Sequence, residues 1–339
     1  MSSSPASARA QWICTTPTKN ESWIIDKFVA AASTWANHVI VADQRSTDGT
    51  CEQLRQTPSV NLVLNDLPAY DESYRQQLLL NRARLINGPR ILIGLDADEA
   101  FSANARATSD WQKILNAKPG TILRFRWVNI LPGFQKAWIP PAHVPFGFVD
   151  DGAEHVGKRI HSPRVPQPLN APTLDLDEIV VLHFQYVLWE RMLSKQRWYQ
   201  AWEYAKNQKK GPLDIFREYN HMLSGWNKSE IHPVRPEWLA GYEQAGINFR
   251  SLTAEPVTWW DREVVQLLRE HGPSRFRKIA IWGKDWNKQA ARLALNDIDL
   301  SDPRSVCEKT VHRLLASTQD IRGNLATRAL ERVLRVSGW

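Results

Sequence analysis

The sequence predicts an α/β protein that has a mostly parallel sheet flanked by helices and a helical C-terminal extension. Short apolar runs alternate with segments of helical periodicity over residues 11–95. The run at residues 91–95 (Ile-Leu-Ile-Gly-Leu) has no polar position, as is typical of a parallel strand buried on both faces. Residues 206–339 show mainly helical patterns. These three observations exclude an all-β fold.

The first strand is expected at residues 12–16, where Pro17 ends it, and a helix follows at residues 22–35. Further strands are expected at residues 38–42, 61–64, 91–95 and 179–184. Further helices are expected from residue 51, at 72–86, from 189, and at 261–270, 275–282, 303–316 and 320–336. The order β-α-β-α-β-α-β at the start predicts parallel strands joined by right-handed crossovers.

Two carboxylates, Asp96 and Asp98, stand where the strand at residues 91–95 ends. Acidic pairs at a buried strand end cost free energy unless a cation lies between them. The carboxyl edge of a parallel sheet is where α/β proteins bind ligands. A divalent cation that holds a diphosphate would explain both acids, because hard cations take oxygen ligands. A solvated acidic turn is the alternative.

Three ordered blocks resemble the signature of family 2 glycosyltransferases, which have the GT-A (Rossmann-like) fold. They are residues 18–21 (Thr-Lys-Asn-Glu), 40–50 (Ile-Val-Ala-Asp-Gln-Arg-Ser-Thr-Asp-Gly-Thr) and 95–99 (Leu-Asp-Ala-Asp-Glu). The resemblance implies a nucleotide-sugar donor, a Mn²⁺ or Mg²⁺ ion and sugar transfer with inversion. Gln44 and Arg45 depart from the pair that is frequent in the family, which leaves the nucleotide open between UDP, GDP and dTDP.

The resemblance assigns roles to residues of this chain by position. Asp43 would contact the nucleoside, Asp98 would bind the metal, and Asp96 would face the ribose or the metal. The nucleotide pocket would be lined by Thr16, Pro17, Asn20 and Glu21. Arg75 is the candidate for the diphosphate, with a solvated helix face as the alternative.

The middle of the chain is expected to carry the acceptor side. A polar segment follows a Pro/Gly/aromatic stretch at residues 131–148 and precedes the basic segment 158–164. An inverting transferase needs a carboxylate base, and this polar segment offers Asp151, then Asp150 and Glu154. An exposed acidic loop is the alternative.

A late histidine completes the metal shell in many GT-A enzymes. His183, at the end of the strand predicted at residues 179–184, is the first candidate for this role, and His161 is the second. A histidine that is simply packed in the core is the alternative for either.

The expected organisation is a disordered tail at residues 1–10, a GT-A catalytic domain at 11–205 and a mainly helical region at 206–339. The donor half would span residues 11–128 and the acceptor half residues 129–205. No run approaches the roughly 20 apolar residues that a membrane-spanning helix needs. Residues 1–10 lack the apolar core of a signal peptide, and the three cysteines lack the spacing of a metal site. A cytoplasmic location is therefore expected.

Residues 262–339 hold 15 Lys and Arg against 9 Asp and Glu, so they carry +6 of the net charge of +7. The helix expected at residues 320–336 sets arginines opposite an apolar stripe. This pattern fits either lobe packing or peripheral contact with an anionic membrane.

The function predicted from these features is transfer of a sugar from a nucleotide donor to a carbohydrate, lipid-linked or small-molecule acceptor. A nucleotidyltransferase is one alternative, although residues 17–21 lack the Gly-rich phosphate loop of that class. A nucleic-acid-binding protein that uses the basic C-terminal region is another. Residues 1–261 are almost neutral, so no nucleic-acid partner is expected.

Overall fold

The computed structural model describes residues 9–206, 210–223, 230–253, 255, 257–295 and 297–339, so the tail predicted at residues 1–10 lies almost wholly outside the described residues. The chain divides into two compact units, which we call the sheet unit (residues 1–187 and 230–253) and the helical unit (residues 188–229 and 254–339). This division differs from the boundary predicted after residue 205, because the helix predicted from residue 189 belongs to the helical unit.

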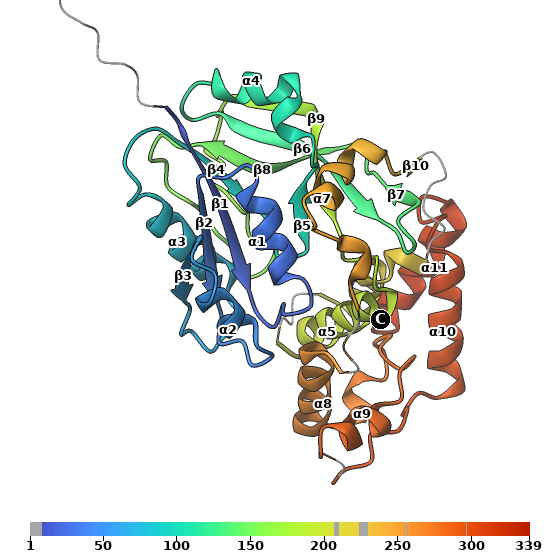
Figure 1. The fold of residues 1–339 in the computed structure, drawn as a ribbon. Helices are drawn as coiled ribbons and strands as arrows, with labels where there is room; N and C mark the ends of the chain where they lie inside the picture. Colours follow the sequence, from blue (N-terminus) through green and yellow to red (C-terminus); the bar gives the residue numbers. More distant parts are fainter. Residues whose placement is uncertain (1–8, 207–209, 224–229, 254, 256, 296) are drawn as a thin grey trace, which may run out of the picture. The chain divides into compact units, whose positions relative to one another are not determined.

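The strands of the sheet unit are β1 (Gln11–Thr18), β2 (His38–Asp43), β3 (Val60–Leu64), β4 (Arg90–Gly94), β5 (Glu99–Phe101), β6 (Ile122–Ile130), β7 (Lys136–Trp138), β8 (His143–Val149), β9 (Thr173–His183) and β10 (Ile231–Pro233). Its helices are α1 (Ile25–Ser33), α2 (Thr50–Arg55), α3 (Glu72–Ala83), α4 (Ser109–Leu115) and α7 (Ala240–Gln244), with short 3₁₀ turns η1 (Ala105–Ala107), η4 (Pro236–Trp238) and η5 (Phe249–Ser251) (Figure 1).

Four parallel strands in the order β3-β2-β1-β4 form one half of the sheet, with β3 at its edge, which confirms the predicted α/β class. The crossover through α1 moves from β1 to β2, and the crossover through α3 moves back from β3 to β4. Right-handed crossovers that run in opposite directions place their helices on opposite faces of a sheet. Both faces of β1 and β4 are therefore covered, which explains their continuous apolar runs.

The core under α3 shows how the apolar positions of helix and strands meet. Leu79 and Leu80 of α3 pack with Ile13 of β1, Ile40 of β2 and Leu92 of β4, all at most 6% exposed. Asp71 caps this helix, since its carboxylate accepts a hydrogen bond from the backbone N of Tyr74 at 3.0 Å. Burial of such side chains contributes roughly 1.5–3 kcal/mol each.

The first strand continues through Pro17 to Thr18, two residues beyond its predicted end. Pairing of β1 with β4 ends at Thr15 opposite Gly94, so Pro17 has only β2 beside it. Successive residues of a strand point their backbone groups to opposite neighbours. The missing N–H of Pro17 falls on the side where β4 has ended, and the strand therefore tolerates it.

The second half of the sheet is mixed and was largely missed by the sequence patterns. β8 runs antiparallel to β4 and to β6, and β9 runs parallel to β6 and antiparallel to β5. The Pro/Gly/aromatic stretch at residues 131–148, for which no strand was predicted, contains β7 and most of β8. The prolines and glycines of this stretch break the alternating apolar pattern by which a strand is recognised in a sequence. The pairing of β8 with β4 also depends on a strand distant in sequence.

The helical unit consists of α5 (Trp189–Lys206), α6 (Pro212–Tyr219), α8 (Trp259–His271), α9 (Trp286–Arg292), α10 (Val306–Ser317) and α11 (Leu325–Val336), with 3₁₀ turns η2 (His221–Leu223) and η6 (Pro273–Phe276). Capping boxes begin two of the helices, through Thr258 with Asp261 in α8 and Ser305 with Glu308 in α10. The helix predicted at residues 275–282 is wrong, because only η6 and turns follow Gly272 and Pro273.

The last helix, α11, begins five residues later than predicted, where Asn324 caps it. Its apolar stripe is divided: Leu334 packs with Leu315 and Phe216, whereas Val333 is 67% exposed. Among the described residues, no helix has the length and apolar character needed to cross a membrane.

A buried ion-pair cluster joins α3, β4 and β8 at the amino end of β4. Asp150 follows β8, and its side chain is fully buried. Arg84 Nη2 donates to Asp150 Oδ1 at 2.8 Å, and Arg90 Nε donates to Asp150 Oδ2 at 2.9 Å. Burial alone would raise the pKa of Asp150, but the two arginine hydrogen bonds outweigh it and hold the pKa below its ordinary value.

Asp150→Asn is expected to lower the free energy of unfolding by about 3 kcal/mol at pH 7, because two half-buried guanidinium groups lose their buried counter-charge. The folded-state pKa of Asp150 lies below the unfolded value, so this stabilisation is present above pH ~4 and is lost as the pH falls further. Urea denaturation at pH 7 and pH 3.5 measures this difference. Asp151→Asn, at an exposed neighbouring carboxylate, is the control, and an equal effect of both variants would contradict the cluster.

Candidate functional site

The strand order reverses at β1, which lies between β2 and β4. At the carboxyl edge Thr18 is paired with Asp43, and Thr15 is paired with Gly94. Open α/β sheets bind ligands in the crevice where the strand order reverses. The segments that follow β1, β2 and β4 therefore form the candidate site.

The loops after β1 and β2 are tied together by side-chain hydrogen bonds. The backbone N of Asn20 donates to Ser46 Oγ at 2.8 Å, and the backbone N of Thr47 donates to Asn20 Oδ1 at 2.7 Å. Asp43 accepts from the backbone N of Ser46 at 3.1 Å and from its hydroxyl at 2.5 Å, and Thr18 Oγ1 donates to it at 3.2 Å. Asp43, which is only 1% exposed, therefore holds both loops in place. Its contact with a nucleoside stays a prediction.

The other residues predicted to line the nucleotide pocket lie at the same edge of the sheet. Thr16 and Pro17 are in the last part of β1, and Glu21 follows that strand. Arg75 lies in the first turn of α3, where its Nη2 is 3.5 Å from Glu72 Oε1.

The segment after β4 carries a dense group of charged side chains. Arg164 Nη2 donates to Asp96 Oδ2 at 2.7 Å, and Arg164 Nη1 donates to Glu99 Oε2. Glu99 Oε1 also accepts from Trp127 Nε1 at 2.9 Å. The side chain of Glu99 is fully buried, and that of Asp96 is 34% exposed. The guanidinium of Arg164 therefore lies between two acids at the end of β4.

Arg164 reaches this place because Gly94 has no side chain. A Cβ at Gly94 would lie 3.1 Å from Arg164 Cβ and from its carbonyl oxygen. The guanidinium also lies 4.7 Å from the ring centroid of Phe146. Burial lowers the pKa of Arg164, but Asp96 and Glu99 outweigh it and raise the pKa. Burial, aided by Asp96, raises the pKa of Glu99 against the opposing effect of Arg164.

His183 faces Asp98 at the end of β9, with 3.6 Å between His183 Nε2 and Asp98 Oδ2. His183 Nδ1 lies 2.7 Å from Asn129 Oδ1, while Asn129 Nδ2 donates to the carbonyl oxygen of Trp138 at 3.2 Å. The amide orientation of Asn129 therefore requires Nδ1 of His183 to carry a proton. In the neutral ring, the lone pair of Nε2 then points to the Asp98 carboxylate.

Histidines that bind metals are commonly oriented in this way, with the second ring nitrogen held by an oxygen acceptor. Two facing lone-pair groups, on Asp98 and His183, suit a divalent cation or a proton between them. Within the described residues of the sheet unit, no three ligand atoms of His, Cys, Asp or Glu side chains gather within 4.8 Å. Asp96, a further predicted metal ligand, is turned to Arg164 instead.

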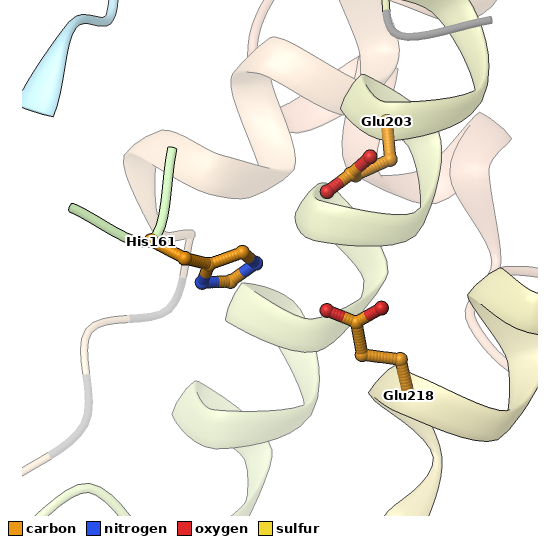
Figure 2. Close-up of side chains that lie close together, drawn as sticks. All are labelled: His161, Glu203 and Glu218. Atoms are coloured by element: carbon orange, nitrogen blue, oxygen red, sulfur yellow. The ribbon is translucent and has the colours of Figure 1, made fainter. Parts of the chain in front are cut away.

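The second histidine candidate, His161, belongs to the sheet unit and has a left-handed backbone with φ 55°. Figure 2 labels it with Glu203 of α5 and Glu218 of α6, which both belong to the helical unit. Those glutamates share the ammonium group of Lys210, at 3.1 and 2.7 Å. This pairing already neutralises part of their charge.

Asp150, one of the three acids predicted to supply the base, is placed away from Asp96 and Asp98. The backbone N of Asp150 donates a hydrogen bond to the carbonyl oxygen of Arg90, at the opposite end of β4. The carboxylate of Asp150 is paired with Arg84 and Arg90. Asp151 and Glu154 follow it in the same segment. The sequence could not show this, because an antiparallel β8 returns the chain to the amino edge of the sheet.

Three residues of the site were given no role by sequence reasoning: Glu99, Asn129 and Arg164. Glu99 belongs to the motif at residues 95–99, so the motif could have indicated that it lies at the site. Arg164 stands in the basic segment 158–164, whose position in the fold no local pattern indicates. Asn129 lies in β6, a strand that the sequence did not predict.

Comparison with known proteins gives neither a matching family model nor a matching curated protein. The solved structures that the chain is similar to include S. aureus TarS 1-349, at 12% identity and a TM-score of 0.39, covering 93% of this chain and 92% of that one. GalNAc-T7 with UDP, GalNAc and Mn²⁺ is similar at 10% identity and a TM-score of 0.38, covering 63% of this chain and 55% of that one.

The inositol-1-phosphate CTP transferase of T. maritima is also similar, at 8% identity and a TM-score of 0.29, covering 53% of this chain and 91% of that one. Such distant likeness assigns neither a family nor an activity to this chain. The functional inference depends on the residues at the ends of β1, β2, β4 and β9.

Arg164→Met is expected to lower the free energy of unfolding by about 3 kcal/mol, because it leaves Asp96 and Glu99 without their cation. Added Mn²⁺ should restore part of the loss, since a divalent cation can replace the lost charge. Arg124→Met is the control, because Arg124 pairs with Asp175 at the surface, where such pairs contribute at most about 1 kcal/mol. Equal melting temperatures for the two variants would contradict a cation requirement at the end of β4.

Proposed function

We propose that this chain is a metal-dependent inverting glycosyltransferase that moves a sugar from a nucleoside diphosphate donor to a hydroxyl group. The observation that carries the proposal is the buried pair of Asp98 and His183, whose imidazole is oriented by Asn129. A pair of this kind at the carboxyl edge of a parallel sheet suits a cation that holds a diphosphate.

The donor would lie along the edge formed by β1, β2 and β4. Its nucleoside would contact the two loops that Asp43 and Asn20 order, with Thr16, Pro17 and Glu21 beside them. UDP-, GDP- and dTDP-linked sugars are the donor candidates, and the acceptor is a carbohydrate, a lipid-linked sugar or a small molecule. Membrane contact through residues 320–336 would suit a lipid-linked acceptor.

The residues fit a Mn²⁺ or Mg²⁺ ion, since Asp98 and His183 supply an oxygen and a nitrogen ligand and Asp96 lies two residues from Asp98. The bound ion would neutralise the charge that develops on the diphosphate leaving group. His161 stays the second candidate for the histidine ligand.

Arg164 would supply the second cation. Its guanidinium lies between Asp96 and Glu99, and a diphosphate at this edge would compete with Asp96 for it. Asp96 would then be released toward the metal or the ribose. Glu99, which is buried and also bonded to Trp127, would keep Arg164 at the site.

In the reaction, the acceptor oxygen forms a bond with the anomeric carbon, and the bond from that carbon to the diphosphate breaks. The nucleoside diphosphate leaves with the bonding electrons, and the acceptor proton passes to a base. The amino-edge position of Asp150 argues against it as this base, and Asp151 and Glu154 stay the candidates.

Titration calorimetry with UDP, GDP and dTDP tests the donor site. At least one nucleotide should bind the unmodified chain tenfold or more tightly with Mn²⁺ than with EDTA. Asp98→Asn should abolish this difference while circular dichroism shows a folded chain. Asp26→Asn, at an exposed carboxylate of α1, should behave as the unmodified chain. Equal affinity with Mn²⁺ and with EDTA for every nucleotide would overturn metal-dependent donor binding.

A further inference from the structure

The helical unit contains a cavity of about 450 Å³ that no step of the proposed reaction uses. Small-molecule pockets of proteins have volumes of roughly 300–1,000 Å³. The cavity lies among α5, α6, α10 and the turns that precede α9. It is therefore large enough for an organic ligand and lies wholly within one unit.

The charge of the cavity wall has one sign. Four cationic side chains line it, and no acidic side chain is among its lining residues. The cations are Arg197, Arg304, Lys309 and Arg313. Asp302 offsets part of this charge, since it pairs with Arg304 at 2.8 Å and lies 3.6 Å from Lys309 Nζ. The charge that remains is repulsive, and an anionic ligand would remove this repulsion.

Arg197 is the least compensated of these cations. Its Nη1 is buried and has no hydrogen-bond partner among the described residues. Burial lowers the pKa of Arg197, and the more distant acids Glu190 and Asp261 offset this only in part. An arginine stays charged even so, because its ordinary pKa is above about 12. A buried guanidinium nitrogen whose N–H groups have no acceptor costs free energy unless a ligand accepts its hydrogen bond.

Arg304 is held at the cavity by its neighbours. Asp302 accepts hydrogen bonds from Arg304 Nε and Nη2 at 2.9 and 2.8 Å. Arg304 Nη1 donates to His312 Nδ1 at 3.0 Å, since His312 Nε2 lies 3.2 Å from the carbonyl oxygen of Lys278. Burial lowers the pKa of His312 to about 4, so this ring is neutral at pH 7 and adds no charge of its own.

The rest of the wall suits the uncharged part of a ligand. Gln196, Gln200 and Asn220 also line the cavity, where Asn220 Nδ2 donates a hydrogen bond to Gln200 Oε1 at 3.0 Å, and apolar side chains complete the wall. The apolar members are Leu193, Phe216, Met222, Ala280 and Ala316. Amides bind hydroxyl groups as donors and as acceptors, whereas a bare phosphate ion would leave most of this wall without a partner.

We propose that this cavity is a second binding site, and that it takes a phosphate ester of a polyol or sugar, with Arg197, Lys309 and Arg313 around the phosphate. Guanidinium groups bind phosphate oxygens through paired hydrogen bonds, which favours phosphate over a single hydroxyl. The inference does not depend on the transferase activity proposed above. The same chemistry occurs in free sugar phosphates and in phosphorylated glycerol headgroups of lipids.

Thermal shift and calorimetry with the full chain test the site, with glycerol 3-phosphate and glucose 1-phosphate as probes and with glycerol, glucose and KCl of matched ionic strength as controls. The esters should bind saturably, and the controls should not. Arg197→Met should weaken ester binding tenfold or more while the free chain stays at least as stable, because methionine removes an unpaired buried charge. Arg332→Met, at an exposed arginine of α11, should bind as the unmodified chain does.

Vesicles that contain phosphatidylglycerol separate the two sources of the phosphate. Sedimentation with them that Arg197→Met abolishes would support a lipid headgroup as the ligand, and binding of free esters alone would support a small metabolite. Equal binding of glycerol and glycerol 3-phosphate would overturn the phosphate assignment. Unchanged ester binding by Arg197→Met, or no binding beyond the effect of KCl, would overturn the site.

Discussion

The need to balance buried negative charge at the end of β4 constrains much of the sheet unit. Asp96, Asp98 and Glu99 occur within four residues, and Glu99 is fully buried. Arg164 can lie beside them because Gly94 lacks a Cβ. The segment that carries Arg164 is itself anchored to α3, where Glu72 accepts a hydrogen bond from the backbone N of Ser162 at 2.8 Å. Loss of the Arg164 guanidinium would leave Asp96 and Glu99 without the positive charge that now neutralises them.

The same principle, that a buried charge requires a partner, separates the two units. In the sheet unit the buried charge that needs a partner is negative, because Glu99 is fully buried near Asp96 and Asp98. In the helical unit the unbalanced charge is positive, because Arg197 and its neighbours converge on a cavity without a lining acid. The net charge of +6 over residues 262–339 therefore has two parts: some arginines are exposed, and others enclose a cavity. Composition alone could not distinguish these.

Local patterns predicted the first half of the sheet well, because β1 to β4 each contain a short apolar run and are joined by single helices, and both features are visible in the sequence. They failed where pairing is distant: β8 was not recognised, so the place of Asp150 at the amino end of β4 could not be predicted. Asp96, Asp98 and His183 were predicted from motifs, and the structure places Asp98 beside His183. Arg164 and Asn129 act across 65 and 54 residues of sequence, so no local pattern could assign them. The helix expected at residues 275–282 is wrong, because the chain forms η6 and then turns there.

The coordination of Mn²⁺ by the full chain with a bound nucleoside diphosphate tests the central claim most directly. Electron spin echo envelope modulation detects nitrogen ligands of Mn²⁺ through their nuclear spin. We expect modulation from one histidine nitrogen, which His183→Ala removes and His161→Ala retains. Modulation that survives His183→Ala, or that is lost in His161→Ala alone, would contradict the pair of Asp98 and His183 as the metal site.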